Sequence, residues 1–369
     1  NRQDTPALGK KLDAADSTDP ENDAAFDESD NAAENNNGTD NVSESRNDAD
    51  NGTDVKSKTG SNKDSDKRYF TYKLLHILCI IGFIVFGALF INEAFIQPIR
   101  IKNSTDYTRD LYKRLTPSPV PSINNTKPTP APVKEQAEPT TLPPTPTPDP
   151  NRDEYGRLLQ FSELLAVNDD VKGWISIPDT TIDYVVVQSD PDNPEYYLDK
   201  DINHEYSKAG TLFLDVHSSV EDNSRSLVIY GHNMVSTPEK MFRDLNKYKV
   251  DKKNKKEVPD FYKEHPLIKF DTIYQTGEWK IFAVFITNGS DKKEPFFDYT
   301  RSYFADASDF LNYVYQIRIR SELNIDCVDI TDTDQLLVLS TCSYEVDNYR
   351  TVVVARRVRE GEDSFVDVD

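Results

Sequence analysis

A run of 18 predominantly apolar residues, Leu74 to Ile91, divides this chain into parts that do not share one fold. As a helix, a run of that length crosses the hydrocarbon core of a membrane. The 73 residues before it are too many for the charged segment of a cleaved signal peptide, and no small-residue cleavage site follows cleanly. The run therefore predicts a single transmembrane signal anchor, which occupies residues 67–98 together with its basic flank.

Positive charges on the two sides of this run indicate its orientation. Lys63, Lys67, Arg68 and Lys73 crowd the N-terminal side, which favours a cytoplasmic N-terminus. Basic residues within 100–109 on the other side oppose that assignment. The balance predicts the N-terminus inside the cell and the large C-terminal part outside.

The segments that flank the anchor have compositions that do not support a core. Residues 1–66 hold 17 acidic and 7 basic residues with almost no large apolar ones, so we expect a disordered, acidic cytoplasmic tail. It serves as a solvated spacer, or alternatively as a docking segment. Residues 99–152 are expected to form a juxtamembrane segment, with a short helix at 99–116, and a Pro/Thr-rich extracellular linker. From Pro117 to Pro150 the composition favours polyproline II, which at ~3.1 Å per residue extends roughly 100 Å.

Charge and cysteine usage exclude some classes of protein. The formal net charge of −21 argues against nucleic acid as a partner, because phosphate contacts need a basic face. Three cysteines are too few for a disulfide scaffold. Cys79 lies in the apolar run, and the apolar/polar alternation around Cys327 predicts a half-buried strand residue. A bridge between Cys327 and Cys342 remains open at this point.

Residues 153–362 have the aromatic and β-branched content of one packed domain, followed by a C-terminal tail at 363–369. Helical spacing of apolar residues predicts a helix at 157–167 and a longer one from Asp306 to Leu323. Short apolar runs predict strands at Trp174–Ile177, Ile182–Gln188, Gly210–Asp215, Leu227–Tyr230, Ile268–Gln275, Trp279–Thr287 and the two runs that hold Cys342 and Arg350. This pattern predicts a mostly β fold with α insertions, as a barrel or a sandwich.

Three side chains suited to catalysis stand at the ends of predicted strands. Cys342 lies where one apolar run ends and Arg350 where the next begins, so pairing of the two strands brings thiol and guanidinium together. The thiolate is the nucleophilic form of cysteine, and a nearby cation favours it. His232 follows the run Leu227–Tyr230, and histidine exchanges protons near neutral pH. Without the histidine, a buried structural cysteine beside a chance arginine explains the pair equally well.

The segments around these residues resemble those of a known family. YGHNM, LSTCSYE and NYRTVVVARR are similar to the His, Cys and Arg motifs of sortases, the Gram-positive cell-wall transpeptidases, and most similar to class B. The blocks GWISIP, IDYVVVQ, YYL and GTLFLD support the resemblance in the same order, which covers roughly residues 155–360. The resemblance implies a closed eight-stranded β-barrel with an N-terminal helix and a long helix before the last strands.

The same resemblance implies an activity and a location. Cys342 attacks the C-terminal sorting signal of a secreted protein, often of NPxTN type in class B, and an amine of the cell-wall precursor then takes the acyl group. His232 carries the proton, Arg350 stabilises the oxyanion or positions the substrate, and no metal or cofactor takes part. The enzyme is expected in the plasma membrane of a Gram-positive bacterium with its catalytic domain outside. Alternatives are a pilin-polymerising enzyme with a Lys acceptor, a hydrolytic cysteine peptidase and a non-catalytic, membrane-tethered barrel.

Residues beside the three catalytic candidates are expected to bind substrate. Ser340 precedes Cys342 by two and lies on the same strand face, and Thr341 matches the threonine before the family's cysteine, which orients the loop. Arg356 and Arg357 compete with Arg350 for the arginine role, and Arg356 shares its strand face. We expect both of these competitors to face solvent and form salt bridges.

Overall fold

The computed structural model describes residues 62–116, 149–250, 259–289, 296–323, 325–343 and 348–368. The chain divides into two compact units between Glu93 and Ala94. The predicted acidic tail up to residue 61 and the predicted Pro-rich linker at 117–148 lie outside the described residues, so both stay predictions.

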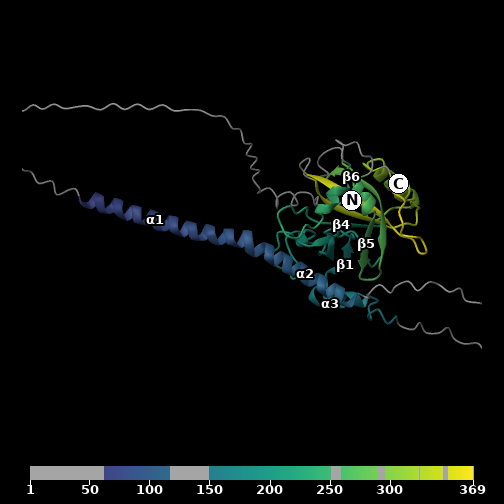
Figure 1. Cartoon of the computed structure of the whole chain (residues 1–369), viewed down its shortest axis with the longest axis horizontal. Coiled ribbons are helices and arrows are strands. Elements are labelled where there is room, and N and C mark those ends of the chain that lie inside the picture. Colours follow the sequence, from purple (N-terminus) through teal and green to yellow (C-terminus); the bar gives the residue numbers. More distant parts are fainter. Residues whose placement is uncertain are drawn as a thin grey trace, which may run out of the picture. The chain divides into compact units, whose positions relative to one another are not determined.

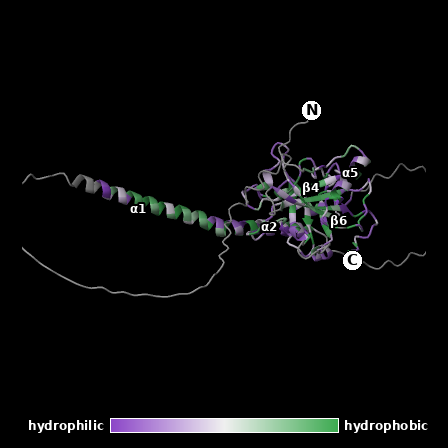
Figure 2. Ribbon diagram, turned by 90° about the horizontal axis from the view of Figure 1, so that it is seen from above, coloured by the Kyte–Doolittle hydropathy of each residue, from purple (hydrophilic) through white to green (hydrophobic). Residues whose placement is uncertain are grey.

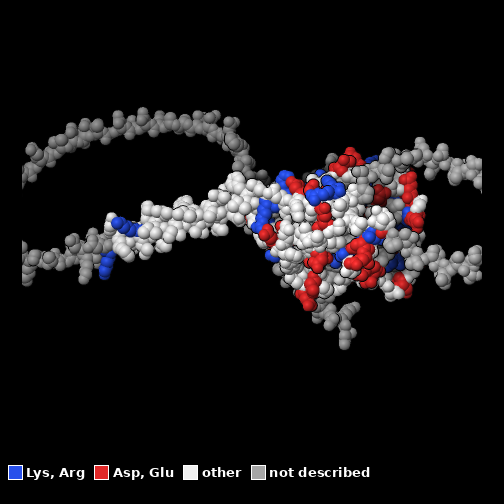
Figure 3. All heavy atoms as spheres, turned by 90° about the horizontal axis from the view of Figure 1, so that it is seen from below, with Lys and Arg blue, Asp and Glu red and all other residues white. Residues whose placement is uncertain are grey.

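Helix α1, Asn62–Ile91, holds the apolar run. Most of this helix is hydrophobic, as its green colour in Figure 2 shows, and its apolar side chains are exposed. In Figure 3 the charged residues of α1 lie only near its N-terminal end. A helix that is apolar on every side is typical of a membrane span. Within the described part of the chain, this is the one helix with the length and composition to cross a membrane.

Eight strands close into a barrel in the order β1-β2-β3-β4-β7-β8-β6-β5, which confirms the expected fold; Figure 1 labels β1, β4, β5 and β6 among them. Their bounds are β1 Val171–Ser176, β2 Asp183–Gln188, β3 Leu212–Leu214, β4 Ser226–Tyr230, β5 Leu267–Thr272, β6 Glu278–Asn288, β7 Leu336–Ser343 and β8 Tyr349–Arg357. Antiparallel pairing of β1 with β5 closes the ring. Two neighbouring pairs are parallel, β2 with β3 and β4 with β7.

The strands at the centre of the sequence motifs are buried on both faces. Every residue of β4 is buried, and so are the seven inner residues of β8. One face fills the barrel, and helices cover the other, since the 3-10 helix η4, Arg243–Tyr248, lies against β8 and β7. Continuous burial explains why these strands read as unbroken apolar runs rather than as alternating patterns.

Helices lie around the barrel at its edges. They are α2 Gln97–Leu115, η2 Leu159–Phe161, α3 Ser162–Val167, η3 Tyr196–Leu198, α4 Asp260–Glu264 and α5 Ala307–Arg318, and the π-helical turn η1 Asn92–Ile96 precedes α2 in the chain. The predicted N-terminal helix corresponds to η2 with α3, and the predicted long helix corresponds to α5, whose N-cap Asp306 accepts a hydrogen bond from the backbone N–H of Asp309. Helix α2 was expected in a segment outside the catalytic domain, yet it packs on β2, η2 and α3.

The prediction for Cys327 was wrong. The residue is exposed and lies in a bend, not in a strand. The guanidinium of Arg318 donates to the carbonyl oxygens of Ile325, at 3.0 Å, and Val328. Arg318 at the end of α5 therefore takes the place of a neighbouring strand as the hydrogen-bond donor to this segment. The alternation of apolar and polar residues around Cys327 arises because the loop packs on one side only, which buries Ile325 and Val328.

Candidate active site

The register of three adjacent strands brings the three candidate catalytic residues into one row. Cys342 on β7 lies directly opposite Arg350 on β8, and side chains at such positions have Cβ atoms about 4.5–5.5 Å apart. In the parallel pair β4–β7, Tyr230 is level with Ser340. His232 is two residues beyond Tyr230, and Cys342 is two residues beyond Ser340, so the histidine follows β4 at the level of the cysteine.

Cys342 and Arg350 are both buried, with 5% and 1% of their surface exposed. No disulfide bond joins Cys342 to Cys327, which removes the alternative left open by the sequence. Arg350 donates from Nη1 to the carbonyl oxygen of Tyr349 at 3.1 Å. Gly289 at the end of β6 lies against its side chain, and a Cβ there would be 3.1 Å from Arg350 Cγ. The arginine is thus held between two strands.

His232 is buried, and its ring is bound by the backbone of another element. Nε2 lies 2.8 Å from the carbonyl oxygen of Leu198 at the end of η3. A carbonyl only accepts, so Nε2 carries the hydrogen, and Nδ1 is left as the nitrogen that exchanges protons. The next residue, Asn233, donates from Nδ2 to the carbonyl oxygen of Cys342 at 3.2 Å. This contact ties the histidine loop to the cysteine strand.

A buried polar layer lies beneath the cysteine and the arginine. Tyr299 Oη is 3.0 Å from Ser340 Oγ. Burial raises the pKa of Tyr299, and the nearby charge of Arg350 opposes that rise. Further in, Tyr230 Oη donates to Asp215 Oδ2 at 2.8 Å, and burial raises the pKa of Asp215. Sequence reasoning missed these tyrosines, because the chain neighbours of a tyrosine give no sign of which partner its hydroxyl meets.

The two predicted substrate-binding residues are occupied within the fold. Ser340 is 1% exposed, and its hydroxyl pairs with Tyr299 as described above. Thr341 is fully buried on the opposite strand face from Cys342 and lies opposite Thr351, whose Oγ1 donates to Asn246 of η4 at 2.8 Å. The structure brings His232, Cys342 and Arg350 together and places Thr341 on the other side of the sheet.

The expectation that Arg356 faces solvent was wrong. Its side chain is buried, and its Nη1 and Nη2 each donate to a carboxylate oxygen of Glu362 at 2.6 Å. Six residues separate Arg356 from Arg350 along β8, which is about 20 Å in a strand. Arg356 therefore lies at the other end of the barrel and does not compete for a place beside Cys342. Arg357 is half-buried and donates to the carbonyl oxygen of Thr276.

Comparisons with known proteins converge on one family. A family model described as a sortase domain matches residues 175–358. Sortase B of Listeria monocytogenes is 34% identical over 188 residues, which cover 51% of this chain and 69% of that protein. Sortase B of Staphylococcus aureus is 28% identical over 202 residues, covering 54% and 75%. The crystal structure of sortase B from Bacillus anthracis in complex with AAEK1 shares the fold, with a TM-score of 0.52 at 22% identity, covering 72% of this chain and 99% of that one.

Proposed function

This chain belongs to the sortase family as a class B sortase, a cysteine transpeptidase, and from that premise we propose that Cys342, His232 and Arg350 carry out its reaction. The observation that supports this assignment is the register of β4, β7 and β8, which places a nucleophile, a proton carrier and a cation in one row. Backbone carbonyls bind the side chains of His232 and Arg350, and Cys342 is fixed by its place in β7, so the row is organised before a substrate arrives.

In the first half of the reaction, the proton of the Cys342 thiol passes to Nδ1 of His232, and the resulting thiolate attacks a peptide carbonyl carbon of the sorting signal. The carbonyl oxygen becomes an oxyanion, which the guanidinium of Arg350 stabilises by charge-assisted hydrogen bonds. The C–N bond then breaks, and the leaving amine takes a proton from Nδ1 of His232, because Nε2 is bound to the carbonyl oxygen of Leu198. The products are a thioester on Cys342 and a free downstream peptide.

In the second half, an amine of a cell-wall precursor attacks the thioester. Nδ1 of His232 takes the proton from the incoming amine, and the thiolate of Cys342 leaves as the new amide forms. Burial of the cysteine and the histidine limits access of water to the thioester, which favours an amine acceptor over hydrolysis. A lysine of a pilin subunit has the same chemistry as an acceptor, and the experiment below includes it.

Helix α1 anchors this enzyme in the membrane of a Gram-positive cell in our proposal, with the N-terminus in the cytoplasm. Sortases are membrane-associated in Gram-positive bacteria, and the exposed apolar surface of α1 needs a lipid environment. The barrel then acts outside the cell on secreted proteins that carry a C-terminal sorting signal.

The test uses the full chain in detergent micelles. Fluorogenic peptides of NPxTN, SPxTG and LPxTG type are incubated with and without an amine acceptor, and products are identified by mass spectrometry. Triglycine represents a cell-wall amine and a lysine-containing peptide represents a pilin. We expect cleavage of one peptide type, an amine adduct, and loss of both in Cys342→Ala, His232→Ala and Arg350→Ala. Release of the free acid alone, even with amine present, would indicate a hydrolytic peptidase. Inactivity toward all peptides, with Cys342 inert to a thiol-reactive sulfonate, would leave a non-catalytic barrel.

A further inference from the structure

Helix α2 is fixed on the barrel by a buried face. Ile101, Leu111 and Tyr112 are buried at helical spacing along it. Tyr112 stacks on Trp174 of β1 with ring centroids 4.5 Å apart, and its hydroxyl donates to Asp271 of β5 at 2.8 Å. These contacts determine the direction in which the other side chains of the helix point, and they direct Arg109 toward the loop that follows β4.

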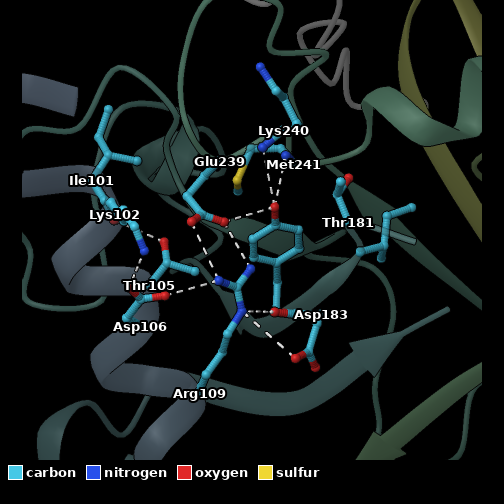
Figure 4. A network of polar contacts seen from close by, with 12 residues as sticks. Ile101, Lys102, Thr105, Asp106, Arg109, Thr181, Asp183, Glu239, Lys240 and Met241 are labelled. Atoms are coloured by element: carbon cyan, nitrogen blue, oxygen red, sulfur yellow. Dashed lines mark hydrogen bonds and ion pairs between the residues drawn. The ribbon is translucent and has the colours of Figure 1, made fainter. Parts of the chain in front are cut away.

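Arg109 binds that loop through Glu239 (Figure 4). Its Nη2 donates to Glu239 Oε2 at 2.8 Å and its Nη1 to Oε1 at 3.4 Å, while Nε donates to the carbonyl oxygen of Asp183 at 3.0 Å. The guanidinium carbon lies 5.0 Å from the ring centroid of Tyr184. The side chain of Arg109 is 20% exposed and that of Glu239 is 9% exposed, so solvent screens this ion pair much less than it screens a surface pair.

Tyr184 extends the contact from Glu239 to the backbone of the loop. Its hydroxyl donates to Glu239 Oε2 at 3.1 Å and accepts from the backbone N–H groups of Lys240, at 3.3 Å, and Met241, at 3.2 Å. Burial raises the pKa of Tyr184, so the phenol stays protonated and able to donate. Met241 has a φ of +51°, which is strained for a long side chain, so these contacts hold a backbone conformation that is costly by itself.

The end of the loop that Tyr184 contacts, at Lys240 and Met241, is hydrogen-bonded to the end that carries His232. Met241 forms a β-bridge with Asn233, and the backbone N–H of Phe242 donates to the carbonyl oxygen of His232 at 2.9 Å. Asn233 in turn donates to the carbonyl oxygen of Cys342 at 3.2 Å. Hydrogen bonds therefore run without a break from α2, through Glu239 and Tyr184, to the backbone of both catalytic candidates.

We propose that Arg109 is a positioning residue for the transpeptidase reaction, because by holding Glu239 it keeps the loop of residues 232–242 in the conformation that places His232 beside Cys342. The inference rests on the proposed function, since it explains how the histidine is held in place. Arginine suits this role because its planar fork reaches both carboxylate oxygens and a backbone carbonyl at once, which lysine does not. Helix α2, which follows the apolar helix in the chain, is then a part of the catalytic unit.

The experiment compares full-length variants in detergent micelles. Arg109→Gln and Glu239→Gln each remove the ion pair, the double variant tests whether they act together, and Arg109→Lys keeps the charge. Arg114→Gln is the matched control, because it makes the same charge change on the same helix in a residue that is 54% exposed and pairs only with Asp110 and Glu163 among described residues. Two quantities are measured: deuterium exchange of residues 232–242, and kcat and KM for the peptide that wild type cleaves.

We expect Arg109→Gln to speed exchange in the loop at least tenfold and to lower kcat about 10- to 100-fold, with KM within about twofold. Glu239→Gln and the double variant should have the same effect as Arg109→Gln, because each of these changes breaks the same Arg109–Glu239 ion pair. Arg109→Lys should fall between Arg109→Gln and wild type. Arg114→Gln behaves as wild type. Melting curves show whether each variant is folded, and if Arg109→Gln is not, Arg109→Lys takes its place.

The inference would be overturned if Arg109→Gln and Arg109→Lys had the same loop exchange and the same kcat as Arg114→Gln. A fall in kcat without faster loop exchange would also overturn it, because the effect would then not pass through the loop. A wild type that cleaves no peptide refutes the proposed function instead, and the exchange comparison still decides whether Arg109 holds the loop.

Discussion

Glu362 binds two buried cations at the end of the barrel remote from the candidate active site, and neutralising it should destabilise the fold. Arg356 donates to both of its carboxylate oxygens at 2.6 Å, and Lys280 Nζ donates to Oε1 at 2.7 Å. Both cations are more than nine-tenths buried. The change Glu362→Gln keeps the size of the side chain and removes the charge that compensates them.

The magnitude follows from the geometry. Removing one partner of a buried ion pair costs about 3–5 kcal/mol. Glu362 is itself 23% exposed, and the glutamine oxygen still accepts a hydrogen bond, so we expect the lower end, about 3 kcal/mol. For a unit of this size each kcal/mol lowers Tm by about 2 °C, which predicts a fall of about 6 °C. Peptide cleavage per folded molecule should not change, because Arg356 lies far from Cys342.

The effect should depend on pH with a definite sign. The hydrogen bond from Arg356 holds the pKa of Glu362 well below its ordinary value of 4.5, by more than burial raises it. A carboxyl group with a lowered pKa stabilises the fold above the unfolded-state value, and this stability is lost as pH falls through the folded-state value. The difference in Tm between wild type and Glu362→Gln is therefore complete at pH 7.5 and shrinks below about pH 4.5.

The assay is thermal unfolding of the full chain in detergent micelles, followed by circular dichroism at pH 7.5 and pH 3.5. Asp110→Asn is the control, because Asp110 is 69% exposed and its ion pair with Arg114 should contribute less than about 1 kcal/mol. A Tm for Glu362→Gln within about 1 °C of wild type at pH 7.5 would refute a stabilising role for this ion pair. A difference that stays equal at the two pH values would show that charge is not its cause.

Three further substitutions test the site itself. Arg350→Lys keeps the charge but loses the planar fork, and should lower kcat for peptide cleavage roughly 10²- to 10³-fold; a loss of less than about threefold would contradict an oxyanion role. Gly210→Ala places a Cβ 2.4 Å from the carbonyl oxygen of Leu198, which binds the ring of His232, so peptide cleavage should be lost. Gly156→Ala is the control, because Gly156 also has a positive φ but has open space around its Cβ, and this variant should stay active. Ser340→Ala leaves the buried hydroxyl of Tyr299 without this partner and should cost about 1–2 kcal/mol in urea unfolding with KM unchanged, while a clear rise in KM would restore Ser340 as a substrate contact.

Local patterns were sufficient to predict most of the helices and strands. The apolar run became α1, and the strands around Cys342, Arg350 and His232 formed close to their predicted bounds. A strand or helix depends mainly on residues a few positions apart, so its signal survives in the sequence alone. The resemblance to the family added the closure of eight strands into a barrel, which periodicity does not contain.

The sequence by itself thus determined an apolar helix, a mostly β domain and the choice of the cysteine, histidine and arginine that we propose as catalytic. Only the tertiary structure decided that Arg356 is buried against Glu362, that Leu198 binds the ring of His232, and that Arg109 reaches Glu239. Each of these contacts joins groups from separate elements, and only the closure of the barrel and the packing of α2 bring them together. Such contacts depend on strand register and helix rotation, which the neighbours of a residue in the chain do not specify.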